Sequence, residues 1–131
     1  MDCKLCLLWK YVCYKLHYME KIELEYYVTD AGLSPFIEWI QDLKDRKGSI
    51  AIRARLTRFQ AGLLGDVKSV GDGVYEARVN YGPGYRFYYT HHQNRVILLL
   101  VGGDKSTQKR DILKAKEYWF DFRQEEFNDK K

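Results

Sequence analysis

The segment from residue 74 to residue 104 limits the possible folds of this chain more than any other stretch. It holds three runs rich in apolar and aromatic residues, at 74–81, 85–90 and 96–101. The first run alternates between apolar and polar residues, which is typical of a strand with one buried face. The last run is apolar throughout, which favours a strand covered on both faces. The segment therefore predicts three consecutive antiparallel strands.

Two short connections separate these runs. The first is Gly82-Pro83-Gly84, whose residues supply the dihedral angles that a tight reversal needs. The second is residues 91–94, with the sequence His-His-Gln-Asn. We expect His91 and His92 to be exposed turn residues, which leaves only a minor possibility that they assist proton transfer.

An additional strand and a first helix are predicted before this segment. Residues 21–29 alternate in polarity and should pair with the sheet. Ser34 followed by Pro35 has the order expected of an N-cap and a first helical residue. The helix is expected to end near Gly48.

A second helix is predicted from Ser49 to about Gly65. Its apolar stripe consists of Ile52, Leu56, Phe59 and Leu63. Three arginines fall off this stripe: Arg53, Arg55 and Arg58. The short connection to the first helix implies an antiparallel helical hairpin. Residues 65–73, which include Lys68, are expected to form a loop.

A third helix is expected to open at residues 104–108. Its apolar stripe consists of Ile112, Ala115, Trp119 and Phe122, and a frayed tail should follow. Its first half is crowded with Lys105, Lys109, Arg110, Lys114 and Lys116. A phosphate group would find both these cations and the helix N-terminus there. The predicted fold is α+β, with a small antiparallel sheet of one N-terminal strand and a three-stranded meander, packed with a helical hairpin and a C-terminal helix.

The chain divides into an extension at 1–18, one domain at 19–123 and a tail at 124–131. The formal charge is only +4, but residues 44–116 hold 15 Lys and Arg against 6 Asp and Glu. This basic middle suggests a face that binds a polyanion, and the alternative is a solvated surface of mixed charge. No apolar run approaches the roughly 20 residues that span a bilayer, so a cytoplasmic protein is expected.

All three cysteines lie in the extension at residues 1–18. Cys3, Cys6, Cys13 and His17 have ligand types that could hold zinc. The extension has no Gly or Pro to form the turns of a compact zinc site. A short apolar helix or a disordered leader is therefore favoured over a metal site.

The strongest candidate for a functional surface is a basic and aromatic face of the sheet. Arg78 and Arg86 lie on neighbouring predicted strands, on either side of the Gly-Pro-Gly turn. The tyrosines interleaved with them are Tyr81, Tyr85, Tyr88 and Tyr89. Guanidinium binds phosphate bidentately, and tyrosine can stack on a base or donate to phosphate. The alternative is that these tyrosines belong to the core and that Glu76 simply pairs with an arginine.

Three motifs resemble the RelE/ParE toxin superfamily of toxin–antitoxin modules, in particular the addiction-module killer proteins. The motifs are VYEARV at 74–79, GPGYRFYY at 82–89 and LLLVGGDKSTQ at 98–108. With the order of predicted elements, the resemblance covers about residues 22–120. It implies a type II toxin that cleaves mRNA on the ribosome, where an RNA 2′-hydroxyl attacks the adjacent phosphate without a metal or other cofactor.

The resemblance also implies roles for individual residues. Arg86 matches the arginine that stabilises the transition state, Arg78 matches a basic residue of the preceding strand, and Lys105 lies near the basic residue that follows the last strand. Glu76 stands where the RelE pattern has a lysine, and it is a candidate general base unless cations hold it in a tight pair. The residues expected to bind RNA are Lys68, Tyr81, Tyr85, Lys109 and Arg110.

Two alternative functions stay open. One is a ParE-like protein that poisons a topoisomerase by binding to it, and the other is an inactive module that only binds its antitoxin. Converging cations favour RNA cleavage, since a pure protein binder does not need them. The resemblance implies a cognate antitoxin, often a small helix-turn-helix protein, besides the ribosome and mRNA as partners, and no membrane.

Overall fold

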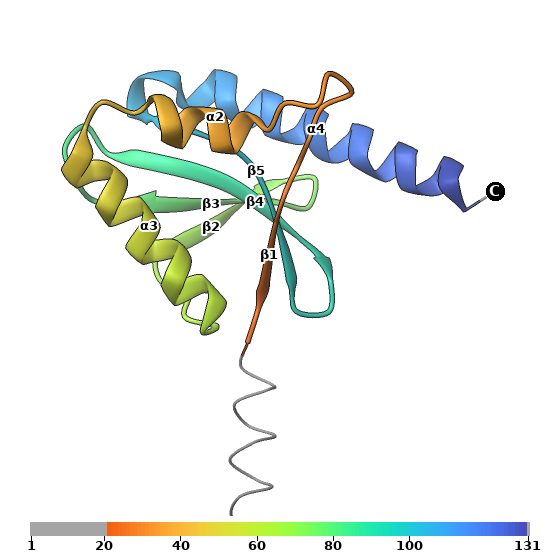
Figure 1. Ribbon diagram of the computed structural model, residues 1–131, viewed down its shortest axis with the longest axis horizontal. Coiled ribbons are helices and arrows are strands. Elements are labelled where there is room, and N and C mark those ends of the chain that lie inside the picture. The colour runs from red at the N-terminus through yellow and green to blue at the C-terminus, as the bar shows by residue number, and fades with distance from the viewer. Residues whose placement is uncertain (1–20, 131) are drawn as a thin grey trace, which may run out of the picture.

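The computed structural model describes residues 21–130 and shows a five-stranded sheet with helices on both faces (Figure 1). The strand order is β1-β5-β4-β3-β2. Strand β1 (Glu23–Tyr26) runs parallel to β5 (Val96–Asp104), and the other neighbours are antiparallel. The predicted α+β class is confirmed, and the N-terminal strand makes the sheet mixed rather than wholly antiparallel.

The meander has four strands, because the residues expected to form a loop at 65–73 include β2 (Val67–Gly71). This prediction was wrong because β2 is a short edge strand, mostly exposed and with a register shift between Ser69 and Gly71, so it shows no clean alternation. Its turn into β3 (Val74–Val79) is formed by Asp72 and Gly73. Both have positive φ angles, 57° and 81°, as a tight hairpin turn requires.

Strand β4 (Tyr85–Gln93) is longer than the apolar pattern predicts. His91 and His92 lie within the strand, and the turn to β5 comes only at Asn94 and Arg95. His91 packs against the rings of Tyr75 and Tyr89. His92 packs against α4 (Gln108–Asp129), with its Nε2 3.0 Å from a carboxylate oxygen of Glu126. These contacts keep both histidines in the sheet, so the expectation of turn residues was wrong.

Two consecutive helices precede the meander, as predicted. Ser34 caps α2 (Pro35–Asp42) by accepting a hydrogen bond from the amide of Ile37. Helix α3 (Arg46–Gln60) begins before the expected cap at Ser49, because Asp45 caps it by accepting from the amide of Gly48. In Figure 1 the two helices cross at a steep angle rather than lying side by side.

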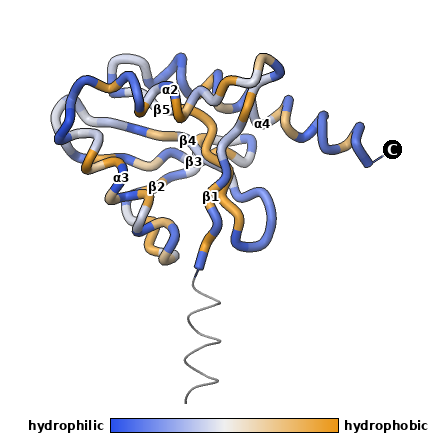
Figure 2. The backbone as a smooth tube through the Cα atoms, in the orientation of Figure 1, coloured by the Kyte–Doolittle hydropathy of each residue, from blue (hydrophilic) through white to orange (hydrophobic). Residues whose placement is uncertain are grey.

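The two faces of the sheet carry separate apolar cores. Helices α2 and α3 cover one face, where residues such as Phe36, Ile52 and Phe59 pack on Phe87 and Tyr89. Helix α4 covers the other face, and its buried residues Ala115 and Trp119 pack with Tyr88, Leu98 and Leu100. Leu63, expected in the stripe of α3, lies beyond the helix end and is exposed. Figure 2 shows the hydrophobic colour along much of β5 and in patches on the helices.

The glycine pair at the end of β5 lets both layers approach the sheet. A Cβ atom at Gly102 would collide with the Trp39 ring of α2, and one at Gly103 would collide with the Asp111 carboxylate of α4. Neither glycine has a positive φ angle, so the requirement here is space rather than backbone conformation. The Gly-Gly sequence therefore sets how closely α2 and α4 pack on the sheet.

Helix α4 continues to Asp129, so the expected tail at 124–131 is helical over most of its length. The longer helix follows from His92 and from the ring of Tyr27, which comes directly after β1, because both contact Phe122 and extend the contact surface of α4 past Trp119. Within residues 21–130, no helix combines the length and apolarity needed to cross a membrane. The extension at 1–18, with its cysteines and the zinc alternative, lies outside the described residues.

Arg55 of α3 is buried, although the helical pattern places it off the apolar stripe. Its guanidinium donates to three backbone carbonyls: Leu64 at 2.8 Å, Asp66 at 2.8 Å and Arg78 at 2.9 Å. These bonds join α3 to the segment before β2 and to the end of β3. The position of Arg55 off the apolar stripe does not reveal this burial, because it depends on backbone carbonyls from other segments that accept its hydrogen bonds.

We expect Arg55→Leu to destabilise the fold by about 3 kcal/mol or more, because it removes three hydrogen bonds in a buried position. Arg58→Leu, a change of an exposed arginine on the same helix, should stay within about 0.5 kcal/mol of the wild type. Urea denaturation followed by circular dichroism measures both. Equal stabilities of the two variants would show that the three hydrogen bonds contribute little.

Candidate functional site

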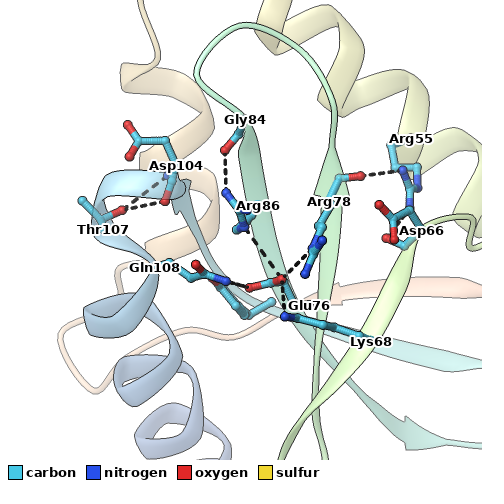
Figure 3. Close-up of polar contacts among 11 residues, drawn as sticks. Arg55, Asp66, Lys68, Glu76, Arg78, Gly84, Arg86, Asp104, Thr107 and Gln108 are labelled. Atoms are coloured by element: carbon cyan, nitrogen blue, oxygen red, sulfur yellow. Dashed lines mark hydrogen bonds and ion pairs between the residues drawn. The ribbon is translucent and has the colours of Figure 1, made fainter.

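A fully buried carboxylate, that of Glu76 on β3, lies at the centre of a polar cluster (Figure 3). Three cations face its Oε1 atom: Arg78 Nε at 3.2 Å, Arg86 Nε at 3.7 Å and Lys68 Nζ at 3.8 Å. The register of the sheet brings them together, since Lys68 is paired with Glu76 and Arg78 is paired with Arg86. The three strands β2, β3 and β4 thus each contribute to this site, which we call the Glu76 cluster.

The second oxygen of Glu76 is bonded from the other side of the cluster. Oε2 accepts hydrogen bonds from the Tyr88 hydroxyl at 3.0 Å and from Gln108 Nε2 at 2.9 Å. Tyr88 lies directly opposite Glu76 on β4, and Gln108 is the first residue of α4. The start of α4 is therefore joined directly to the cluster.

These contacts determine the ionisation of Glu76. Burial by itself raises the pKa of the carboxyl group, but the hydrogen bonds from Gln108, Tyr88 and Arg78 and the charge of Lys68 outweigh it, so the pKa lies below its ordinary value. Burial, together with the neighbouring Glu76 carboxylate, raises the pKa of Tyr88. Glu76 is thus a carboxylate and Tyr88 a neutral donor at neutral pH.

A carboxylate in this state is a poor general base. Both oxygens of Glu76 are occupied by donors, and the lowered pKa weakens its affinity for a proton. The role that such a residue can play is electrostatic: it neutralises the arginines and fixes their orientation. Glu76 therefore holds the cations in place, and the expectation that it acts as a base is not supported by its contacts.

The two arginines differ in exposure. The Arg86 side chain is 12% exposed, and its Nη1 donates to the Gly84 carbonyl at 3.2 Å. Its Nε is buried without a hydrogen-bond partner among the described residues, because 3.7 Å from Glu76 is too long for one. The Arg78 side chain is 38% exposed. One guanidinium is thus held deep in the sheet with donor capacity unused, and the other reaches solvent beside it.

A second group of basic residues lies where β5 joins α4. Lys105 is in the short helix η1 (Lys105–Thr107), and Lys109 and Arg110 are in the first turn of α4. All three are exposed around a depression of about 370 Å³ lined by residues 105–110. Gln108 lies within this segment and contacts Glu76, so the segment adjoins the Glu76 cluster. Among residues 21–130, none of its three cations contacts the carboxylate itself.

The two tyrosines predicted to bind RNA lie in different surroundings. Tyr81 is 37% exposed in the turn between β3 and β4. Tyr85 is buried under α3 on the opposite face of the sheet, where its hydroxyl donates to Asp45 at 2.6 Å. Burial and this hydrogen bond raise the pKa of Tyr85 to about 12. Tyr85 is therefore a structural residue that ties the β3–β4 turn to α3, and its assignment as an RNA ligand is corrected.

Sequence reasoning missed two members of the cluster. Tyr88 could have been placed by the alternation of β4, because it lies two residues after Arg86 and so on the same face. Gln108 gives no such signal, since its position depends on how α4 docks on the sheet. No three His, Cys, Asp or Glu side chains within residues 21–130 lie close enough together to form a metal site.

We expect Glu76→Gln to destabilise the protein at pH 7 by about 2 kcal/mol or more, because it leaves a buried guanidinium without its counter-charge. The folded-state pKa of Glu76 is lowered, so its stabilisation is fully present above the ordinary glutamate value of 4.5 and is lost as the pH falls below it. Denaturation curves of both proteins at pH 7 and pH 3.5 measure this. The difference between them should shrink at the lower pH, and an unchanged difference would contradict an ionised Glu76.

The comparisons with known proteins place these residues in a family. Residues 38–118 match the phage-derived protein Gp49-like family (DUF891), a family commonly part of toxin–antitoxin modules of the RelE/HigB type. An uncharacterized protein of Haemophilus influenzae is 46% identical over 81 residues, which cover 62% of this chain and 82% of the relative. The matched segment contains every residue of the Glu76 cluster, and it also contains Lys109. The chain belongs to the phage-derived protein Gp49-like family.

Proposed function

We propose that this protein is the toxin of a type II toxin–antitoxin module and that it cleaves mRNA on the ribosome without a metal ion. The observation that carries this proposal is the Glu76 cluster, in which one buried carboxylate holds Arg78 and Arg86 on the same face of neighbouring strands. The Gly82–Gly84 turn and α4 border this face. Family membership supports a toxin-like role, and the cluster supports the chemistry.

The arginines would act on the charge that develops during RNA cleavage. The 2′-oxygen of a ribose forms a bond to the adjacent phosphorus, and the bond from phosphorus to the 5′-oxygen of the next nucleotide breaks. The 2′-hydroxyl loses a proton and the 5′-oxygen gains one, which leaves a 2′,3′-cyclic phosphate and a 5′-hydroxyl. Negative charge spreads over the phosphate oxygens in the transition state, where fixed guanidinium groups stabilise it.

The unused donor capacity of Arg86 fits this role. Its Nε has no hydrogen-bond partner among the described residues, and Arg78 beside it reaches solvent. A phosphate placed over the pair would accept hydrogen bonds that the protein itself does not complete. Glu76 would keep the guanidinium groups from moving with the substrate, so less reorganisation is needed during the reaction.

The remaining cations would bind the RNA strand on either side of the scissile phosphate. Lys68 lies at one border of the cluster on β2, and Lys105, Lys109 and Arg110 lie at the other border on η1 and α4. Tyr81 is exposed at the β3–β4 turn and could stack on a base. The extent of this basic face makes a polynucleotide a better fit than a small phosphorylated molecule.

A cognate antitoxin is the partner that this proposal requires. The family is commonly part of toxin–antitoxin modules, and a segment with acidic residues would neutralise the same basic face that binds RNA. The sequence resemblance further suggests a small helix-turn-helix protein.

We expect Arg86→Ala to abolish growth inhibition, because loss of one charge at the transition state costs about a hundredfold or more in rate. Arg53→Ala is the matched control, since it removes the same charge from an exposed position on α3. Both proteins are induced in cells, and their folding is checked by circular dichroism. A folded Arg86→Ala protein that still inhibits growth fully would remove Arg86 from the mechanism.

Cleavage should also survive chelation of metal ions. In a translation extract that has received mRNA bound to ribosomes, EDTA is added together with just enough magnesium to keep the ribosomes intact. This EDTA treatment should leave the rate of RNA cleavage unchanged, and so should a chelator specific for zinc or manganese. The reason is that guanidinium groups supply the positive charge. A loss of cleavage that added zinc or manganese restores would overturn the proposal of a metal-independent enzyme.

A further inference from the structure

The start of β1 borders two adjoining depressions on the surface of the protein. The first has a volume of about 540 Å³ and is lined mainly by apolar groups, among them Ile22, Leu63 and Ile97. The second has a volume of about 530 Å³, shares Ile22 with the first and is also lined by Leu24 and Val96. We call the two depressions together the β1 groove.

The β1 groove brings the apolar core under α2 and α3 to the surface. Ile22 and Leu24 pack against that core with one side and are only partly buried. Leu63, just beyond the end of α3, is 63% exposed. A concave site with exposed apolar side chains is a place where another group can bind. The described residues, 21–130, thus leave this edge of the core open to solvent.

The main chain enters the described structure at the groove. The amide of Ile22 donates to the carbonyl of Gln60 at 2.7 Å, and the amide of Glu23 donates to the carbonyl of Arg95 at 2.8 Å. These two hydrogen bonds fix the start of β1 between the end of α3 and the β4–β5 turn (Figure 1). Lys21, the residue before them, lines the second depression. Residues 1–20 are therefore attached to the rest of the chain at the groove itself.

The sequence of residues 1–20 is that of a segment which needs an apolar surface. Only six of these residues are charged or histidine, and the other fourteen are apolar or aromatic. Large apolar residues recur at spacings of three and four, at Leu5, Leu8, Trp9, Val12, Leu16 and Met19. This pattern predicts one continuous apolar stripe, whose exposure to water is unfavourable unless another surface covers it.

We infer that residues 1–20 dock into the β1 groove of their own chain through this apolar stripe. The segment is joined to the groove without an intervening linker, so its local concentration there is on the order of millimolar. A free partner at micromolar concentration has a disadvantage of roughly a thousandfold against it. The groove and the segment each leave apolar surface uncovered, and docking buries both.

The inference goes beyond the proposed RNA chemistry, because the β1 groove and the Glu76 cluster lie on opposite faces of the sheet. Ile97 of the groove belongs to the core under α2 and α3. Tyr88, which donates to Glu76, belongs to the core under α4. Docking of residues 1–20 in the groove therefore leaves the cluster open, and its test does not depend on RNA cleavage.

The test measures how accessible the groove is in the full chain. The three native cysteines are replaced by serine, and one new thiol is introduced by Leu63→Cys or, as a matched control, by Ile50→Cys on α3. The two positions are similarly exposed in the described structure, at 63% and 60%, so without docking their thiols should react with a maleimide at similar rates. With residues 1–20 in the groove, the thiol at position 63 should react at least about tenfold more slowly.

Two substitutions in the segment should uncover the groove. Leu8→Ser combined with Trp9→Ser removes the largest part of the apolar stripe, so labelling of Leu63→Cys should become about tenfold faster or more, while labelling of Ile50→Cys should not change. Equal labelling rates at the two positions in the chain with an intact segment would overturn the inference. So would a slow reaction at position 63 that the two serine substitutions do not alter, because something other than the segment would then cover the groove.

A second measurement identifies the chain to which the docked segment belongs. With Cys13 restored, a bismaleimide with a short spacer should link it to Leu63→Cys within one chain, and the two serine substitutions should slow this reaction by about tenfold. Denaturing electrophoresis and mass spectrometry of the linked peptides identify the product. Links that form only between two chains would assign the groove to a second copy of the protein and would contradict docking within one chain.

Discussion

The buried carboxylate of Glu76 is the interaction on which the functional face depends. Five side chains from three strands and one helix converge on its two oxygens. Their ion pairs and hydrogen bonds stabilise a negative charge that is buried away from water. Two arginines on neighbouring strands would otherwise repel one another across about 5 Å of sheet. With Glu76 between them, their repulsion is offset and their orientation is fixed. The cost of burying the carboxylate is thus offset by the same cations that form the proposed anion site.

The rest of the fold positions this cluster. Arg55 joins α3 to the carbonyl of Arg78 and to the segment that leads into β2, so the opposite layer determines where two of the cationic strands begin and end. On the other face, Gly103 leaves room for Asp111, and this close approach lets Gln108 reach Glu76. The glycines at the end of β5 and the polar cluster are therefore parts of one arrangement, in which the spacing between layers sets the geometry of the site.

Much of this could be predicted from local sequence patterns. The alternation in residues 74–79 and the turn at 82–84 predict two neighbouring strands, and that pairing brings Arg78 and Arg86 together. What depends on tertiary contacts could not be predicted so directly. Arg55 looks like a surface residue of an amphipathic helix until the carbonyls that it binds are in place. The contacts that make Glu76 a counter-ion rather than a base come from three strands and a helix, so they appear only in the folded protein. Tyr85 is adjacent to Arg86 on β4 and therefore lies on the opposite face, which the alternation of the strand could have indicated.

The most direct test of the proposed function is the chemistry of the RNA ends that the wild-type protein leaves in a translation extract. Mapping of 5′ ends locates the cuts, and enzymatic treatment identifies the terminal groups. The account predicts cuts at codon boundaries in mRNA on ribosomes, with a 2′,3′-cyclic phosphate on one fragment and a 5′-hydroxyl on the other. Intact mRNA together with relaxed or broken DNA would contradict it and would favour a protein that acts on a topoisomerase.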